Sequence, residues 1–525
     1  MYGGYGQVIE KLLISKREIC NEFENSIKIK VPPMGTVIFK MRKKGGDLMK
    51  VLFVGSEANP FIKTGGLGDV LGSLPKSLSK TGVDSRVVIP KYKNIREDLQ
   101  NKLKFIKWFM VKVGWRTQYC GVFQYNNDGV TYYLLDNEYY FGRDGLYGYY
   151  DDGERFAFFN RAVLTFLKEL DFKPDIIHCN DWHTGMIPVL LKVEYSKNEF
   201  YKDIRSIFSI HNIKFQGIFP KEVLQDLFGY DLELYYNGTL AFDDGISFMK
   251  GGILYSDRIS TVSYSYVDEI KTEEYGERLN YILKDREYAL SGILNGIDYD
   301  EFNPETDPFI YSNFNKNSLY KKRNNKEELQ KELGLPINRN IPMISMVSRL
   351  TNQKGLDLLV DIADKLLQYD IQLVILGTGD YHYENHFKGL ADRYRYKVSS
   401  NIKFDNTLAH KIYAATDMFL MPSLFEPCGL GQLIALRYGS IPIVRETGGL
   451  KDTVFAYNQY NGIGNGFSFK NYNANELLNT IEYALEIYKD KNRWNSIVLQ
   501  ALSSNNSLEK SANDYKAIYN QVIGD

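Results

Sequence analysis

Short apolar runs that end in glycine or polar residues alternate along this sequence with amphipathic stretches, and this alternation constrains the fold most strongly. Predicted strands form a first series at 51–55, 85–89, 176–179, 206–210 and 258–262, and a second at 342–347, 372–376, 401–404, 418–421 and 441–444. Amphipathic stretches at 355–369 and 476–488 predict helices. Because strands that alternate with helices form parallel sheets with right-handed crossovers, two series predict an α/β protein with two doubly wound, Rossmann-like domains.

The boundary between the two domains is predicted within 295–308, where Gly, Asp, Asn and Pro concentrate without periodicity. The stretch 321–336 that follows is typical of an exposed, charged helix. Near the amino terminus, alternating residues in 27–31 and 36–40 predict two short strands around a Pro-Pro-Met-Gly turn. We interpret 1–48 as an N-terminal appendage that precedes the core, either a β-strand remnant of a fusion or an extended reading frame.

Composition excludes several classes of protein. The sequence is 44% hydrophobic and 25% charged, which is typical of a soluble globular protein. Its net charge of −1 provides no global field to hold nucleic acid or an anionic membrane. No apolar run approaches the ~18 residues of a membrane span. The four cysteines are far apart and form no Cys-x-x-Cys pair, which argues against a disulfide framework and favours a reducing cytoplasm.

A glycine-rich turn at 63–75 is the first candidate binding segment. It follows a predicted strand, and a helix is expected to begin near Gly66–Leu67. The glycines let the backbone approach a ligand closely, the helix start offers free N–H groups, and Lys63 adds a cation. The turn matches neither the Walker spacing nor a complete G-x-G-x-x-G, because Leu71 stands at the third glycine position. Read alone, it is equally compatible with a structural role.

A second candidate segment, 175–185, places polar residues at the carboxyl end of a predicted parallel strand, where open α/β sheets bind ligands. A metal site would need a third ligand beside His178 and His183, and none has suitable spacing. We therefore expect a structural His178, a substrate-contacting His183 and no metal. His211, at a similar strand end, is expected to anchor its loop or line the pocket.

Two further segments combine charge with loops that begin helices. In 345–355 a buried strand delivers Arg349, and Lys354 follows near a helix start, so both cations suit a diphosphate. The alternative is a pair of surface cations in ordinary salt bridges.

In 421–450 Glu426 precedes Cys428, Gly429 and Leu430, and a second close-approach loop is formed by Thr447, Gly448 and Gly449. At a helix start Cys428 is expected to have a lowered pKa, but no base is evident nearby, so pocket lining is favoured over a nucleophilic role.

Taken together and in this order, these segments resemble the bacterial glycogen synthase and plant starch synthase family. The motifs that carry the resemblance are KTGGLGDV, NDWHTG, HNIKFQG, SRLTNQKG, PSLFEPCGLGQ and RETGGL. The resemblance extends from about Met49 to the carboxyl terminus and implies the GT-B fold, two Rossmann-like domains that face each other across a cleft. It also implies that the final helix packs back on the first domain. The expected domains are therefore the appendage 1–48, the acceptor-side domain 49–295, the nucleotide-sugar domain 296–505 and the helix 506–525.

The resemblance further implies transfer of glucose from ADP-glucose to the non-reducing end of an α-1,4-glucan, with retention of anomeric configuration and without a cofactor. Carried over to this sequence, the catalytic residues are His183, Arg349, Lys354 and Glu426. The substrate-binding residues are Lys63, Gly66, Asp69, Cys428, Gly429, Leu430, Thr447, Gly448 and Gly449. Many other retaining glycosyltransferases carry a second Glu where this chain has Ile434, and the difference favours the glycogen and starch synthase branch.

Mechanistically, departure of the diphosphate leaves an oxocarbenium-like sugar, and preorganised cations and N–H groups stabilise the growing negative charge. We expect same-face attack, with a donor phosphate oxygen accepting the proton of the acceptor hydroxyl, and cleft closure between the domains. The alternatives are a UDP-glucose-dependent transferase, a GT-B sugar-nucleotide epimerase, a phosphorylase and a non-catalytic glucan-binding protein. Partners are expected to be donor and glucan, with neither nucleic acid nor membrane.

Overall fold

The computed structural model describes residues 48–524. The strands predicted at 27–31 and 36–40 therefore lie outside the described residues.

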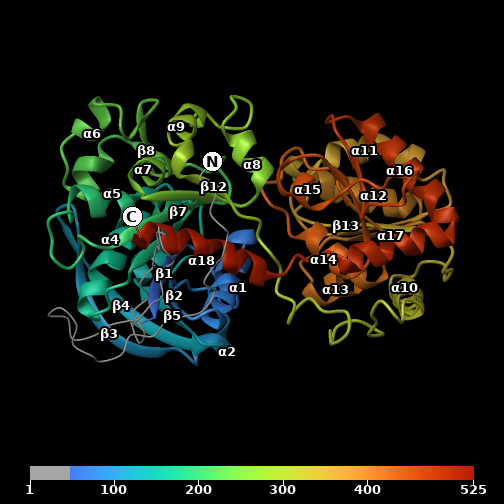
Figure 1. The fold of residues 1–525 in the computed structure, drawn as a ribbon, viewed down its shortest axis with the longest axis horizontal. Coiled ribbons are helices and arrows are strands. Elements are labelled where there is room, and N and C mark those ends of the chain that lie inside the picture. The colour runs from blue at the N-terminus through green and yellow to red at the C-terminus, as the bar shows by residue number, and fades with distance from the viewer. Residues whose placement is uncertain (1–47, 525) are drawn as a thin grey trace, which may run out of the picture. The chain divides into compact units, whose positions relative to one another are not determined.

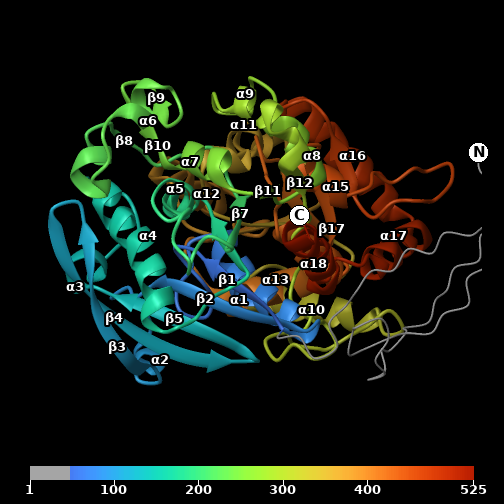
Figure 2. The same ribbon diagram turned by 60° about the vertical axis from the view of Figure 1, so that its left-hand side comes forward.

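The first half of the described chain is built on a nine-stranded sheet with the order β12-β11-β7-β6-β1-β2-β5-β4-β3 (Figure 1). Seven strands run parallel: β1 (Met49–Val54), β2 (Val83–Pro90), β5 (Val130–Asp136), β6 (Ile176–Asn180), β7 (Arg205–Ile210), β11 (Arg258–Thr261) and β12 (Leu290–Gly292). An antiparallel hairpin of β3 (Lys104–Val113) and β4 (Arg116–Asn127) completes one edge (Figure 2). A small antiparallel sheet adds β8 (Ile218–Pro220), β9 (Ala241–Phe242) and β10 (Gly245–Ser247).

Helices cover both faces of the nine-stranded sheet. Each face is apolar and packs against its helices in a separate apolar cluster. The longer helices are α1 (Gly66–Lys80), α4 (Asp152–Glu169), α5 (Met186–Val193) and α7 (Phe248–Tyr255). The shorter ones are α2 (Glu97–Gln100), α3 (Glu138–Phe141), α6 (Glu233–Tyr236), α8 (Tyr264–Ile270) and α9 (Asn280–Asp285). Single turns are the 3-10 helices η1 (Trp182–Thr184) and η3 (Glu287–Ala289) and the π-helix η2 (Leu224–Phe228).

The second half is built on a fully parallel six-stranded sheet with the order β15-β14-β13-β16-β17-β18. Its strands are β13 (Met343–Val347), β14 (Gln372–Leu376), β15 (Val398–Asn401), β16 (Met418–Met421), β17 (Ile441–Arg445) and β18 (Phe467–Phe469). Its helices are α10 (Tyr320–Glu332), η4 (Asn352–Lys354), α11 (Leu356–Leu366), α12 (Tyr381–Arg393), α13 (Asn406–Ala415), α14 (Gly431–Arg437), α15 (Gly448–Thr453), α16 (Ala474–Lys489) and α17 (Lys491–Ser503). The two parallel sheets, each with crossover helices, confirm the predicted α/β class.

The predicted strands occur where the apolar runs lie, with one displaced, but five strands of the two large sheets were not predicted: β3, β4, β5, β12 and β18. The strand expected at 401–404 lies at Val398–Asn401 instead, because Asp405 accepts the N–H of Leu408 and caps α13, which leaves 402–404 as the connection. The hairpin of β3 and β4 was not predicted. Its strands alternate buried and exposed residues and interrupt the strand–helix rhythm, so the pattern that identified the parallel strands did not apply to them.

Each sheet reverses its strand order at a central strand, and this position determines where a ligand can bind. In the first sheet β1 lies between β6 and β2, and in the second β13 lies between β14 and β16. A crevice opens beyond the carboxyl ends of parallel strands at such a switch point. The segments that follow β1, β6, β13 and β16 are the four candidate segments of the sequence, so the topology brings them to the switch points.

The final helix, α18 (Leu508–Gly524), lies beside α1 and closes one face of the nine-stranded sheet (Figure 1). Tyr519 of α18 bonds Nδ1 of His178 at 2.8 Å, and the other ring nitrogen of His178 bonds Ser209 at 2.5 Å. His178 is 1% exposed. These contacts confirm that His178 is structural: it ties β6 and β7 to the last helix.

His178 predicts a specific pH dependence of stability. Burial lowers its pKa to about 3 in the folded protein, so below about pH 6.5 the unfolded chain binds a proton that the folded chain does not. The stability that the buried, neutral His178 imidazole contributes is therefore complete above that pH and is lost as the pH falls. Between pH 7 and pH 5, His178→Asn should remove about 2 kcal/mol of the decline in unfolding free energy. Urea unfolding at both pH values measures this, with the exposed His382→Asn as control; an equal decline in all three proteins would contradict it.

Candidate active site

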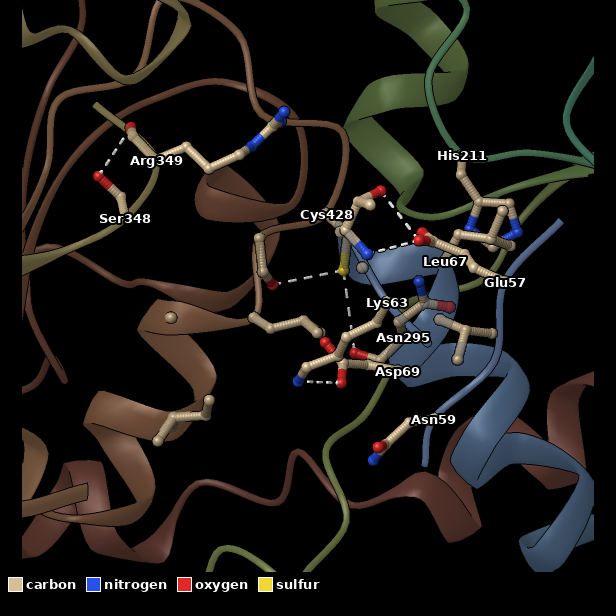
Figure 3. Close-up of a pocket in the computed structure, with 18 of the residues that line it drawn as sticks. Glu57, Asn59, Lys63, Leu67, Asp69, His211, Asn295, Ser348, Arg349 and Cys428 are labelled. Carbon is tan, nitrogen blue, oxygen red and sulfur yellow. Dashed lines mark hydrogen bonds and ion pairs between the residues drawn. The ribbon is translucent and has the colours of Figure 1, made fainter. Parts of the chain in front are cut away.

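A cavity of about 850 Å³ is lined by residues that follow strands of both parallel sheets. Ten of the thirteen predicted site residues line it: Lys63, Gly66, Asp69, His183, Arg349, Lys354, Glu426, Cys428, Gly429 and Leu430. In Figure 3, Arg349 extends into the cavity from one side, while Lys63, Asp69 and Glu57 lie on the side of α1. Residues separated by more than 350 positions in the sequence thus meet around one space.

The loop after β1 supplies the first wall of the cavity. Lys63 Nζ lies 2.8 Å from the Asp69 carboxylate, and both side chains are one-third exposed. Helix α1 begins at Gly66, where an added Cβ would have no neighbour within 4 Å, and no side chain of the described residues caps it. The free N–H groups at this helix start and the lysine suit an anionic or hydroxyl-rich ligand.

The segment after β6 supplies a buried aromatic and imidazole wall. The His183 ring stacks on Trp182 with centroids 4.0 Å apart, and it contacts Tyr147 at 4.6 Å. Burial, and next the charge of Arg155, hold the pKa of His183 well below its ordinary value. A neutral imidazole that lines the cavity is suited to a sugar hydroxyl, whereas a positive one would be needed to pair with phosphate.

Asp181, beside His183, adopts an unusual backbone conformation with φ of 56° and ψ of 178°. Its carboxylate accepts the N–H of His211 at 2.8 Å, and burial raises its pKa to about 7. His211 bonds Asn180 through Nε2 at 2.8 Å and lines the cavity, which confirms both roles expected for it. Conformations of this kind are costly outside glycine and persist where surrounding contacts require them, so Asp181 holds two cavity-lining loops together.

The cations of the second sheet differ in their pairing. Lys354 donates to the Glu426 carboxylate at 2.6 Å, and Glu426 also accepts the hydroxyl of Ser423 at 3.1 Å. Arg349, directly after β13, is exposed, and its guanidinium has no hydrogen bond or ion pair to any of the described residues. Beside the Lys354–Glu426 pair, the second sheet therefore presents an unpaired positive charge to the cavity at Arg349, which favours an anionic ligand.

The Glu426–Leu430 loop lies against the start of α14. Gly429 has φ of 71°, a conformation that favours glycine. The sequence predicted a lowered pKa for Cys428, and this is wrong: burial raises the pKa of its thiol to about 12. The thiol is enclosed and lies 4.0 Å from the Asn295 carbonyl oxygen, so desolvation of the thiolate outweighs any effect of the helix start. Cys428 lines the cavity as a thiol.

The segment Thr447–Gly449 is not among the residues that line the cavity. The Glu269 carboxylate of α8 accepts the Thr447 hydroxyl at 3.0 Å and the Gly448 N–H at 2.7 Å. A Cβ at Gly449 would lie 2.1 Å from the Cys428 carbonyl oxygen. The glycines thus permit close approach, as expected, but the neighbour is the backbone of the Glu426–Cys428 loop and not a ligand. The substrate-binding role implied for Thr447, Gly448 and Gly449 stays a prediction.

Several lining residues were missed by sequence reasoning. Glu57 follows β1 and accepts the Thr64 N–H at 2.5 Å, and burial raises its pKa. Phe404 lines the cavity with 81% of its surface exposed, in the loop after β15. The rule that ligands gather at strand ends would have indicated both. Tyr147 lies in a loop far from any parallel strand end and carried no such signal.

No group of three or more His, Cys, Asp and Glu within residues 48–524 is placed to hold a metal ion. The expectation that the site contains no metal remains a prediction. Across the same residues, no helix combines the length and apolar composition needed to cross a bilayer.

Comparison with known proteins decides the family. Residues 50–285 match the starch synthase catalytic domain, and residues 325–498 match glycosyl transferases group 1. A glycogen synthase of Clostridium botulinum is 67% identical over 475 residues, covering 90% of this chain and 99% of that protein. The chain belongs to the glycogen and starch synthase family. A glycogen synthase of Clostridium beijerinckii is 65% identical over 91% of this chain and 100% of its own.

Membership of the glycogen and starch synthase family confirms the resemblance found in the sequence, the enzyme class and the GT-B fold. The catalytic domain of starch synthase IV from Arabidopsis thaliana superposes with a TM-score of 0.85 at 32% identity. That match covers 91% of this chain and 100% of the plant domain. The protein is therefore a glycosyltransferase, and its cavity is the candidate active site of this family.

Proposed function

We propose that the protein transfers glucose from ADP-glucose to the non-reducing end of an α-1,4-glucan and retains the anomeric configuration. The observation that carries this proposal is the single cavity in which Arg349 and the Lys354–Glu426 pair meet Lys63 and His183. Relatives at 65–67% identity are glycogen synthases. The Arabidopsis starch synthase IV structure contains ADP and acarbose, which supports ADP as the nucleotide that this site releases.

The donor diphosphate is proposed to bind between Arg349 and Lys354. A planar guanidinium can bond two phosphate oxygens at once, and an unpaired one loses no ion pair when phosphate arrives. Lys354 would leave Glu426 for the phosphate, and the freed carboxylate would take glucose hydroxyls. Lys354 would then be paired with phosphate, and hydrogen bonds from the glucose hydroxyls would compensate the Glu426 carboxylate in place of the lysine.

The transfer step follows from this placement of charge. The acceptor hydroxyl attacks the anomeric carbon from the face that the diphosphate leaves, and its proton passes to the departing phosphate oxygen. The bond between the anomeric carbon and that oxygen breaks, so the products are ADP and a glucan longer by one glucose. Arg349, Lys354 and the start of α14 would stabilise the charge on the departing phosphate.

The acceptor is proposed to lie on the side of the nine-stranded sheet. His183, neutral and packed on Trp182, would line the glucose and acceptor pocket together with Asp69. Lys63 and Gly66 would bind the donor from the start of α1. Phe404, exposed on the second sheet's side, is proposed to stack on the nucleobase. Glu426 to Leu430 would surround glucose and phosphate, and Thr447 to Gly449 would support that loop from beneath.

We propose the domain division 49–295, 296–505 and 506–525, with domain closure completing the site. The first two of these proposed domains are in contact, since Ser265 of α8 donates its N–H to Asp452 of α15 at 2.8 Å. The cytoplasm is the proposed compartment, and the free thiols of Cys120, Cys179 and Cys428 are consistent with a reducing one.

Incubation with glycogen and either ADP-[14C]glucose or UDP-[14C]glucose tests this function. Label in the polymer from ADP-glucose, with stoichiometric release of ADP, is expected. Digestion by β-amylase should then release the label as maltose, since new residues are α-1,4-linked at non-reducing ends. Incorporation from UDP-glucose alone would contradict the donor assignment. Release of free sugar or nucleotide without polymer label would contradict the transfer itself.

A further inference from the structure

Arg155 is the largest fully buried side chain of the described residues, and no step proposed so far uses it. It lies on α4, one turn after Asp152, and its exposed fraction is 0%. An isolated buried cation is costly, so it must be compensated by charges and acceptors around it. Its Nη2 atom has no hydrogen-bond partner among the described residues, so the compensation comes from Nε and Nη1.

The acceptors of Arg155 all belong to the segment 140–152, which folds around it. Nε donates to the Tyr140 carbonyl at 2.8 Å. Nη1 donates to the Leu146 carbonyl at 3.0 Å and to the Asp152 carboxylate at 2.5 Å. The second oxygen of Asp152 accepts the N–H groups of Gly148 at 2.8 Å and Tyr149 at 3.3 Å. The Arg155 guanidinium and the Asp152 carboxylate thus bond four backbone groups of the same segment.

The Tyr149 ring adds a second layer to this arrangement. It lies 4.8 Å from the Arg155 guanidinium carbon and 4.9 Å from that of Arg143. Its hydroxyl accepts the Gly145 N–H at 2.9 Å, and Arg143 pairs with Asp151 at 2.6 Å. Directional bonds to charged groups therefore fix this segment, in addition to the apolar packing of Tyr140, Phe141 and Leu146 in the main apolar cluster.

The same loop forms part of the cavity wall beside His183. Tyr147, Gly148 and Asp152 line the cavity. The Tyr147 ring contacts the His183 ring at 4.6 Å, and its hydroxyl bonds Ser56 at 2.7 Å. The groups proposed for the donor diphosphate, Arg349 and Lys354, come from the other sheet. The loop held by Arg155 thus lies on the side of the nine-stranded sheet, in contact with His183, the residue proposed to line the glucose and acceptor pocket.

We propose that Arg155 is a positioning residue for the acceptor glucan: it holds the 140–152 loop so that Tyr147, Gly148 and Asp152 present a preformed wall to the acceptor. This inference rests on the proposed function, since it assigns a role in the same site. Arg155 acts through the loop and does not contact the substrate. The planar guanidinium is essential for this role. Its Nε and Nη1 atoms bond three acceptors in different directions, which the single amine of lysine cannot reproduce.

Steady-state kinetics of Arg155→Met and Arg155→Lys test the proposal. Each substrate is varied in turn, with the other saturating. We expect KM for glycogen to rise about tenfold or more in both variants, because misplacement of a binding wall can cost ~100-fold, and KM for ADP-glucose to stay within about twofold of wild type. Arg155→Lys keeps the charge inside the fold, so it remains testable if Arg155→Met does not fold.

Arg161→Met is the matched control, because Arg161 is also on α4 and pairs with Glu194 and the Phe228 carbonyl, away from the cavity. It should lower the melting temperature without changing either KM. The inference is overturned if wild type incorporates glucose and Arg155→Lys has the wild-type KM for glycogen. It is also overturned if the KM values of the Arg155 variants for glycogen and for ADP-glucose rise together, in proportion to lost stability. A wild type that incorporates no glucose would instead overturn the proposed function and this role with it.

Discussion

Alanine at Arg349 is expected to lower kcat by about a hundredfold or more, the scale for losing one charge contact made to the departing group. The free energy of unfolding should change by less than about 0.5 kcal/mol, because the guanidinium is exposed and has no partner among the described residues. Polymer label measures the first quantity and urea unfolding the second. Together they would separate a catalytic role from a structural one.

The matched control for Arg349→Ala is Arg393→Ala, which removes an exposed arginine of α12 outside the cavity that pairs with Asp364. It should retain wild-type kcat. Wild-type turnover in Arg349→Ala would refute the assignment of this residue to the diphosphate.

Lys354→Ala should lose both activity and stability. Its pair with Glu426 is 2.6 Å long, with the two side chains 16% and 8% exposed. Removing the lysine leaves a buried carboxylate without its cation, which typically costs about 3 kcal/mol or more. We also expect kcat to fall by about a hundredfold or more.

The double variant Lys354→Ala/Glu426→Gln distinguishes these two losses. Because the neutral amide needs no cation, unfolding free energy should recover most of the way to wild type, while activity stays low. Recovery of activity together with stability would show that the pair is only structural. A single variant as stable as wild type would contradict the burial argument.

Much of the fold followed from one sequence pattern, because most buried parallel strands read as apolar runs. The parallel strands β5, β12 and β18 were nevertheless not predicted. The same rule located the site: the segments containing Lys63, His183, Arg349 and Glu426 all follow strands next to a switch point. The hairpin of β3 and β4 was not predicted by this pattern, since its strands are covered on one face only.

The pairings within the site were not predictable in the same way. That Lys354 bonds Glu426 depends on how two loops of the second sheet meet, and that Thr447 and Gly448 bond Glu269 depends on how the two halves of the chain meet. The error on Cys428 has a similar origin. A helix start lowers a thiol pKa only where the thiolate is solvated, and burial is decided by distant residues such as Asn295.

A crystal structure of the protein with ADP tests the central claim most directly. The account predicts that the diphosphate lies against Arg349 and Lys354, with Glu426 released from its lysine and facing the place of the missing glucose. Nucleotide bound elsewhere, or diphosphate in the cavity with the Lys354–Glu426 pair intact and Arg349 turned away, would contradict it.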